Sequence, residues 1–372
     1  QVKKWFKLTS NMAFSHSKSM TNDSNGSWGS SGNVFYIANS IGPIYPLYVR
    51  NADGTIKMDN GRIVYDSNNT NFIRPSIVGN AVRDNEYNTK QSYNDLFNGN
   101  WGATITPIAG LTLNATLALS SSHYRYSALY STFGSSSGTE GDAYVYNNRY
   151  YTVNQTYTAN YNKMFDKHNF DILVGYEQYN YMQQYLSGEN TNLYNPYIGE
   201  LDNAFGFNYR SASSSTNNYM TEGILSRLQY DYDSKYFASV SYRRDASSVF
   251  APGHRWGNFG SVGLAWQMNK EKFLETASWV NLLKLKASYG VQGNDNLGDW
   301  QAYADQYTIT PIYDDKNNVT GYSTQMYNKG NENITWETNK AWNVGVDFNL
   351  FGNRLNGSLD FFHRTTTDLL YW

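Results

Sequence analysis

Apolar and polar residues alternate with a period of two along most of this chain. The clearest example runs from 224 to 243, on both sides of a short turn at 233–235. Its apolar positions are Leu228, Tyr230, Tyr232, Tyr236, Ala238, Val240 and Tyr242, and its polar positions include Arg227, Gln229, Asp231, Ser239 and Ser241. A period of two places successive side chains on opposite faces of a strand, so this segment is predicted to form a β-hairpin.

The same hairpin unit recurs, and the connections between hairpins are of two kinds. Further alternating arms occupy 111–119, 151–161, 169–176, 283–291, 342–350 and 355–361, which gives about eleven strands in all. The predicted long polar loops are 16–85, 125–149, 187–218 and 293–334, and 269–279 is predicted to be a short helical connection. Short turns at one end and long loops at the other are typical of outer-membrane barrels. We therefore predict an all-β fold, a transmembrane antiparallel up-and-down β-barrel with short periplasmic turns and long extracellular loops.

Composition supports strands and excludes several functions. Aromatic residues make up 17% of the chain, including 34 tyrosines, while charged residues make up only 16%. Aromatic side chains suit the half-buried surface of a sheet. The net charge of -2 offers no basic surface for nucleic acid, and the absence of cysteine excludes disulfides and thiolate metal sites. No apolar segment is long enough for a transmembrane helix.

Four stretches resemble the SusC/RagA-type family of TonB-dependent outer-membrane transporters. The most specific is 241–266, SYRRDASSVFAPGHRWGNFGSVGLAW, with an Arg-Arg-Asp start, a Ser-Ser-x-Phe core and a Trp-Gly-x-Phe return. The others are WVNLLKLKASYGVQGNDN at 279–296, the segment from WETNKAW to TTDLL within 336–370, and HNFDILVGYE at 168–177. They occur in the family's order and cover much of the second half of the chain.

This resemblance implies more than the alternation does. It implies a barrel of about 22 strands, of which residues 1–372 are a segment, with the N-terminal plug and the remaining strands outside this sequence. It also implies a bacterial outer-membrane location among lipid, energy coupling through the TonB complex and a SusD-like surface lipoprotein as a lid. Oligosaccharide, or less often peptide, is the implied cargo. A dimer of two transporter–lipoprotein pairs is a further expectation.

Candidate chemistry is sparse, and we expect no catalytic residues, no metal ligands and no cofactor. Asn294, Asp295, Asn296 and Asp299 could offer oxygens to calcium, but the twelve-residue loop with its terminal Glu is missing. Arg243 and Asp245 share one face of a predicted strand, so a structural ion pair at the base of a loop is favoured over a ligand contact. Cargo contacts are expected from aromatic residues in the predicted loops, namely Trp28, Tyr36, Tyr45, Tyr48, Trp300 and Tyr303.

Two other functions fit the alternation. A passive porin or an adhesin-type barrel would show the same period, although it would not require the four family-like stretches. A secreted all-β protein is a third interpretation, but the chain has no fixed short repeat and its loops gather at one end. A nutrient importer of the SusC-like class remains the favoured function.

Overall fold

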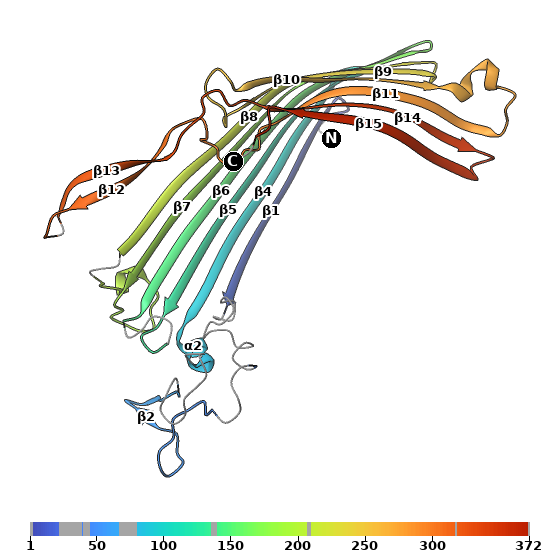
Figure 1. Ribbon diagram of the computed structural model, residues 1–372. Coiled ribbons are helices and arrows are strands. Elements are labelled where there is room, and N and C mark those ends of the chain that lie inside the picture. The colour runs from blue at the N-terminus through green and yellow to red at the C-terminus, as the bar shows by residue number, and fades with distance from the viewer. Residues whose placement is uncertain are drawn as a thin grey trace.

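The chain folds into one curved antiparallel sheet in which each strand pairs with the next (Figure 1). The computed structural model describes residues 3–21, 39, 45–66, 80–134, 140–206, 210–316 and 318–370. The eleven strands of the sheet are β1 (Phe6–Thr21), β4 (Thr89–Ile108), β5 (Leu111–Tyr130), β6 (Asp142–Phe165), β7 (His168–Thr191), β8 (Arg210–Tyr232), β9 (Tyr236–Ser247), β10 (Trp256–Gln267), β11 (Val280–Asn294), β14 (Glu337–Leu350) and β15 (Leu355–Thr367). The predicted all-β, up-and-down arrangement is confirmed.

Tight turns connect the strands at one end of the sheet, which we call the turn end. The β8–β9 turn shows why these turns form where the sequence predicts them. Tyr232 pairs with Tyr236, while Asp233 and Ser234 between them have positive φ angles of 54° and 50°. Two residues of this kind make a turn whose twist matches that of the flanking strands, and Asp is among the residues that tolerate it.

The opposite end, which we call the loop end, differs from the prediction because the strands run further than expected. β1 continues through His16 to Thr21, and β5 and β6 leave a connection of only 131–141 where 125–149 was predicted. Likewise β7 and β8 extend into the predicted loop 187–218. Three of the predicted long loops therefore reached too far into the strands, because backbone pairing continues past the point where the apolar contrast between the two faces fades, whereas the predicted loop 293–334 agrees closely with the connection between β11 and β14.

The remaining connections carry short elements of their own. The predicted helical piece at 269–279 consists of two 3-10 helices, η3 (Met268–Lys270) and η4 (Lys272–Leu274). The β11–β14 connection contains a separate hairpin, β12 (Gln306–Tyr313) with β13 (Val319–Asn328), which projects from the sheet in Figure 1. The rest are β2 (Met58–Asp59), β3 (Arg62–Ile63), α2 (Ala81–Tyr87) and η2 (Leu201–Asn203). Among the described residues, no helix is both long enough and apolar enough to cross a membrane.

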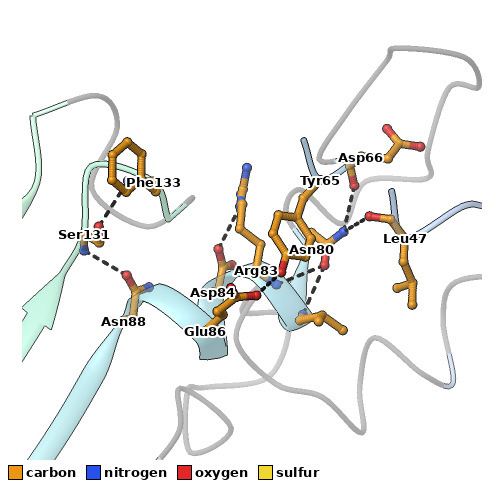
Figure 2. A network of polar contacts seen from close by, with 11 residues as sticks. Leu47, Tyr65, Asp66, Asn80, Arg83, Asp84, Glu86, Asn88, Ser131 and Phe133 are labelled. Atoms are coloured by element: carbon orange, nitrogen blue, oxygen red, sulfur yellow. Dashed lines mark hydrogen bonds and ion pairs between the residues drawn. The ribbon is translucent and has the colours of Figure 1, made fainter. Parts of the chain in front are cut away.

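The described residues 45–66 and 80–88 of the first long connection form a hydrogen-bonded unit next to the loop end of the sheet (Figure 2). Asn80 is 2% exposed and caps α2, accepting from Val82 N and Arg83 N at 3.1 and 3.2 Å. The Asn80 amide also donates to Leu47 O and Asp66 O, at 2.8 and 3.1 Å. One buried side chain thus satisfies helix and loop backbone together, as buried polar groups require.

The far end of α2 ties the same unit to the next connection. Asn88 follows the helix, and its Oδ1 accepts from Ser131 N at 2.9 Å (Figure 2). Gly134 permits this approach, since a Cβ there would lie 2.5 Å from Asn88 Oδ1. Rings fill the space around these bonds, with Tyr87 against Phe133 at 5.5 Å and Phe133 against Tyr197 at 5.9 Å. Three connections therefore form one packed surface at the loop end.

Candidate functional site

The two faces of the sheet differ in chemistry, and that difference defines the candidate site. On β9, β10 and β14 the side chains of Val240, Leu264 and Val344 lie on the outer face and are 50%, 58% and 52% exposed. The positions between them lie on the opposite face and line two hollows of about 620 and 870 Å³. Exposed aliphatic groups on the outside and a polar hollowed inside are what a barrel wall between lipid and water requires. We call the polar side the lumenal face.

An ion-pair cluster crosses three strands of the lumenal face. Lys286 Nζ on β11 lies 2.8 Å from Asp347 Oδ1 on β14 and 3.0 Å from Asp360 Oδ1 on β15. These side chains are about one-third exposed. β14 lies between the strands that carry Lys286 and Asp360, and at its Gly345 an added Cβ would lie 2.2 Å from Asp360 Oδ1. The cluster thus needs a glycine at that position and fixes the wall of the first hollow.

The predicted ion pair of Arg243 and Asp245 is present in the structure and extends further than expected. Arg243 Nη2 lies 3.0 Å from Asp245 Oδ1 on the same strand, β9, and 3.0 Å from Glu177 Oε2 on β7, so the guanidinium reaches across β8 to join two strands. Gly223 lies directly opposite Asp245, and a Cβ there would be 2.1 Å from its Oδ1. Arg244 faces the other side and packs over the Trp256 ring at 5.0 Å. The pair belongs to the lumenal wall below the loops, not to a loop alone.

Among the predicted cargo residues that the structure describes, Trp300 packs against side chains of the lumenal face. Its ring packs against Tyr181 at 5.4 Å and against Tyr219 at 5.6 Å, on β7 and β8. Tyr219 donates to Asp295 Oδ2 at 2.8 Å. Burial, and then Asp295, raise the pKa of Tyr219, so its hydroxyl remains a donor. The connection after β11 is thereby held over the strands, with Trp300 at its inner edge.

A small apolar core fixes that connection in place. Val249 and Phe250 of the β9–β10 connection pack with Leu297 and Trp336, all at most 9% exposed. Trp336 Nε1 donates to Arg255 O at 2.8 Å, and its ring meets Phe250 at 5.3 Å. Burying such side chains contributes roughly 1.5 to 3 kcal/mol each. These contacts therefore fix the β9–β10 and β11–β14 connections to each other.

Of the other predicted cargo residues, Tyr45, Tyr48 and Tyr303 lie within the described part of the chain. Tyr48 packs on Tyr65 at 5.3 Å within the unit that precedes α2, and Tyr45 belongs to the same part of the chain. Tyr303 follows Trp300 in the β11–β14 connection and is half-buried. Trp28 and Tyr36 lie outside the described residues. Their contact with cargo stays a prediction.

Three of the four side chains considered for calcium, those of Asn294, Asp295 and Asp299, accept internal hydrogen bonds. Asn294 Oδ1 accepts from Asn296 N at 3.2 Å, and Asp295 Oδ2 accepts from Tyr219. Asp299 accepts from Gln301 N at 2.8 Å and from Gln306 Nε2 at 2.7 Å. Within the part of the chain that the structure describes, no three His, Asp or Glu side chains gather as a metal site would require. These oxygens order the loop.

Sequence reasoning missed a group of lumenal tyrosines on β5, β6 and β7. Tyr126, Tyr144 and Tyr146 lie in stretches predicted as loop, yet all three are in paired strands. Their ring centroids are 5.3 to 6.2 Å apart. The spacing of tyrosines at every second position, 124 and 126, then 144 and 146, could have indicated strand.

Aromatic residues also gather at the turn end. Tyr236 stacks on Trp266 at 6.4 Å, and both donate to Glu271 Oε1 in the η3–η4 connection, at 2.5 and 3.2 Å. The Tyr236 hydroxyl, more than the indole or Lys235, holds the pKa of Glu271 below its usual range. Trp279 stacks on Phe351 at 5.5 Å at the neighbouring turns. Such rings at the base of hairpins form the girdle expected where a barrel meets the membrane interface.

Comparisons with known proteins agree with this architecture. The family described as "TonB dependent receptor-like, beta-barrel" matches residues 13–372. TonB-dependent receptor P39 of Formosa agariphila is 35% identical over 225 residues, covering 60% of this chain and 21% of that protein. TonB-dependent receptor SusC of Bacteroides thetaiotaomicron is 30% identical over 237 residues, covering 63% of this chain and 22% of that protein.

Among solved structures, the RagAB peptide transporter shares the fold. It matches with a TM-score of 0.78 at 24% identity, over 98% of this chain and 39% of that one. The chain spans about a fifth of the length of the two curated relatives. The chain therefore belongs to the TonB-dependent receptor-like β-barrel family, and its eleven-stranded sheet is part of an outer-membrane barrel.

Proposed function

We propose that this chain forms barrel wall in a SusC-like, TonB-dependent importer that takes up oligosaccharides or peptides. The observation that carries the proposal is the family match over residues 13–372, on a sheet with a hollowed polar face. In this proposal the turn end is periplasmic and the loop end is extracellular. A plug outside these residues would couple the barrel to the TonB complex, and a SusD-like surface lipoprotein would close it.

The structure supports a role for the chain as a rigid conduit. In the cluster of Lys286 with Asp347 and Asp360, and in that of Arg243 with Asp245 and Glu177, each cation meets two carboxylates. Charges that are satisfied across neighbouring strands hold the wall without presenting an unpaired cation to cargo. The packed connections at the loop end would frame the entrance over which a lid could close.

The proposed role is transport rather than catalysis. The family consists of receptors and transporters, and the lumenal side chains described above serve as ion-pair and hydrogen-bond partners. No cofactor is part of the proposal. Assembly into a dimer of transporter–lipoprotein pairs is a further proposal, which rests on the family resemblance.

Uptake in the native bacterium tests the proposal. We expect deletion of TonB to abolish growth on the cargo and accumulation of it, because a plugged barrel needs energy to open. Uptake that persists at the wild-type rate without TonB would favour the passive porin instead. Purification from outer membranes in mild detergent, followed by mass spectrometry, should find a stoichiometric surface lipoprotein. A barrel that purifies alone would contradict the lid.

A further inference from the structure

A continuous tract of aromatic rings covers the lumenal face of four neighbouring strands. Its outer part is a cluster on β5, β6 and β7, in which Tyr146 is the centre. The ring of Tyr146 lies 5.6 Å from Tyr124, 5.3 Å from Tyr126, 6.0 Å from Tyr144 and 6.0 Å from Tyr185. All five rings are partly exposed, so they form a surface and not a closed core.

The inner part continues the same surface toward β8. Tyr150 lies 6.2 Å from Tyr181, which meets Trp300 at 5.4 Å, and Trp300 in turn meets Tyr219 at 5.6 Å. Tyr179 completes this part, 6.0 Å from Tyr219. We call the outer and inner parts together the tyrosine tract.

Amide side chains join the two parts. Asn148 Nδ2 donates to the Tyr150 hydroxyl at 2.7 Å, and Gln183 Nε2 donates to Asn148 Oδ1 at 3.4 Å. Both amides lie at lumenal positions between rings, because alternate residues of a strand share a face. The tract therefore offers flat ring faces with hydroxyl and amide groups between them.

The outer part of the tract lies above the membrane. Tyr150 lies 15 residues before Phe165, the last residue of β6 at the turn end of the sheet. At roughly 3.3 Å per residue and a strand tilt of about 40°, that distance is about 38 Å along the membrane normal. The hydrocarbon core is only about 30 Å thick. The outer part of the tract, together with Tyr150, thus lines the extracellular vestibule beyond the lipid-covered part of the wall, while Tyr179, only 11 residues from the start of β7 at His168, lies at the base of the vestibule.

Within the tract, the side chains that β6 and β7 direct to the lumenal face are uncharged. On β6 every lumenal position from Tyr144 to Asn162 is aromatic, hydroxyl or amide, and on β7 the same holds from Tyr179 to Ser187. The charged residues Arg125 and Arg149 of β5 and β6 occupy positions of the opposite parity. Charged lumenal groups lie at the margins of the tract, with Glu177 toward the membrane, Asp295 bonded to the Tyr219 hydroxyl and Glu189 at the outer end.

Two hydroxyls in the outer part of the tract are held in their protonated form. Burial, and then the hydroxyl of Tyr124, raise the pKa of Tyr146 to about 12. The hydroxyl of Tyr185, and then burial, raise the pKa of Tyr144. The hydroxyls of Tyr144 and Tyr146 therefore stay protonated at physiological pH and can donate hydrogen bonds.

We propose that the tyrosine tract is the cargo-binding surface of the vestibule and that its ligand is a neutral oligosaccharide. The face of an aromatic ring is electron-rich and favours the C–H face of a pyranose, while hydroxyl and amide groups pair with sugar hydroxyls. The carboxylate of a peptide would lose water without gaining a counter-charge here, because the charged groups at the margins that Glu177, Asp295 and Glu189 provide are carboxylates themselves. This assignment names the class of cargo within the proposed function. It rests on that function only for the direction of transport.

Binding to the complete transporter tests this assignment without requiring uptake. The protein, purified from outer membranes in mild detergent, is applied to an array of neutral α- and β-linked oligosaccharides, uronate oligomers and hexapeptides. We expect binding to at least one neutral oligosaccharide and to neither charged class. Preference for uronates or hexapeptides, or no binding to any neutral oligosaccharide, would overturn the assignment.

Variants then locate the surface by titration calorimetry with the best neutral oligosaccharide. Tyr146→Ala and Tyr181→Ala should each raise Kd at least tenfold, whereas Tyr146→Phe and Tyr181→Phe, which keep the ring, should raise it less. Tyr289→Ala on the outer face, where Tyr289 is 45% exposed, is the matched control and should leave Kd unchanged. Heat-modifiable migration on gels confirms that each variant is folded.

Unchanged Kd in folded Tyr146→Ala and Tyr181→Ala would remove the tract as the binding surface. Because the measurement needs no energy source, it separates the two proposals. Tight binding together with TonB-independent uptake would overturn the importer and leave the tract. TonB-dependent uptake without binding to neutral oligosaccharides would overturn the tract and leave the importer.

Discussion

Lys286 and Asp360 lie on strands that are not neighbours, yet Lys286 Nζ is 3.0 Å from Asp360 Oδ1. β14 separates them, and the residue of β14 that pairs with both Lys286 and Asp360 is Gly345. Its missing side chain leaves the space through which the ammonium reaches across. A lumenal glycine here is a requirement of the ion cluster and not a flexible point in the strand.

Gly345→Ala should therefore destabilise the barrel. The added Cβ would lie 2.2 Å from Asp360 Oδ1 and 2.7 Å from Lys286 Cε, so both side chains must move. Overpacking of this kind costs about 1 to 3 kcal/mol. Urea unfolding in detergent, followed by tryptophan fluorescence, measures the change in the free energy of unfolding.

A paired variant isolates the cause. In an Asp360→Ala background the carboxylate is gone, so Gly345→Ala should cost less than it does in the wild-type protein. Gly352→Ala is a less suitable comparison because Gly352 has a positive φ of 66°. Gly321→Ala, in the separate β12–β13 hairpin, is a better control, since an added Cβ there would meet only Ile312 Cδ1, at 4.0 Å. An equal cost in both backgrounds would contradict the steric explanation.

Tyr236→Phe should change how stability depends on acid pH. The Tyr236 hydroxyl is the main cause of the lowered pKa of Glu271, so the charged carboxylate is favoured in the folded state. A lowered folded pKa contributes stability above the unfolded pKa, and this contribution is lost as pH falls through the folded value. The wild-type unfolding temperature should therefore fall more between pH 6 and pH 3 than that of Tyr236→Phe.

Tyr232→Phe is the matched control for this comparison. Tyr232 stacks on Tyr236 with ring centroids 6.3 Å apart, so the control removes one hydroxyl from the same aromatic group. Its pH profile should follow that of the wild-type protein. Parallel profiles for Tyr236→Phe and wild type would show that the Tyr236–Glu271 hydrogen bond has no part in the acid response.

The sequence predicted the turn end of the fold better than the loop end, for a physical reason. Around Asp233 one face of each strand meets lipid and the other meets water, so polarity alternates and the turn residues interrupt it clearly. Beyond the membrane both faces are wet, and the contrast fades although strand pairing continues. Tyr144 and Tyr146 therefore fell within a predicted loop, while the structure has them paired with Glu189 and Ser187.

The candidate site was predictable only in part. Alternation placed Arg243 and Asp245 on one face, and the structure shows them 3.0 Å apart. The contact with Glu177 joins residues 66 positions apart, and the contact of Trp300 with Tyr181 depends on the docking of a whole connection. Local periodicity cannot specify such long-range contacts, because they depend on which loop packs over which strand.

Asn80→Ala should open the unit that precedes α2 without unfolding the barrel. The variant loses the helix cap and leaves Leu47 O and Asp66 O without the Asn80 donor. Loss of an N-cap costs about 0.5 to 2 kcal/mol, so local opening should increase roughly tenfold. Trypsin can cut after Arg50, Lys57 and Arg62, and the rate of those cuts measures the opening.

Asn217→Ala, at an exposed position of β8, is the control and should leave the three cleavage rates unchanged. The urea midpoint of the barrel should be the same in both variants. Cleavage at the wild-type rate in Asn80→Ala would show that the network of Figure 2 does not hold the connection closed.

Asp142→Asn should stabilise the protein increasingly as pH rises. Burial, followed by hydrogen bonding and repulsion from Glu189, raises the pKa of Asp142 to about 7 at the extracellular end of β6. A carboxyl with a raised folded pKa binds its proton more tightly in the folded than in the unfolded state. Its contribution to stability is therefore present below its unfolded pKa of about 4 and is lost as pH rises to about 7.

The asparagine side chain is neutral throughout, so the gain over the wild-type protein should be larger at pH 8 than at pH 5. Unfolding temperatures in detergent at the two pH values provide the comparison. Asp315→Asn, in the exposed β12–β13 turn, serves as control and should give equal differences at both. A gain for Asp142→Asn that shrinks with rising pH would mean that Asp142 is charged in the folded protein at pH 5, and that Glu189 does not hold it neutral.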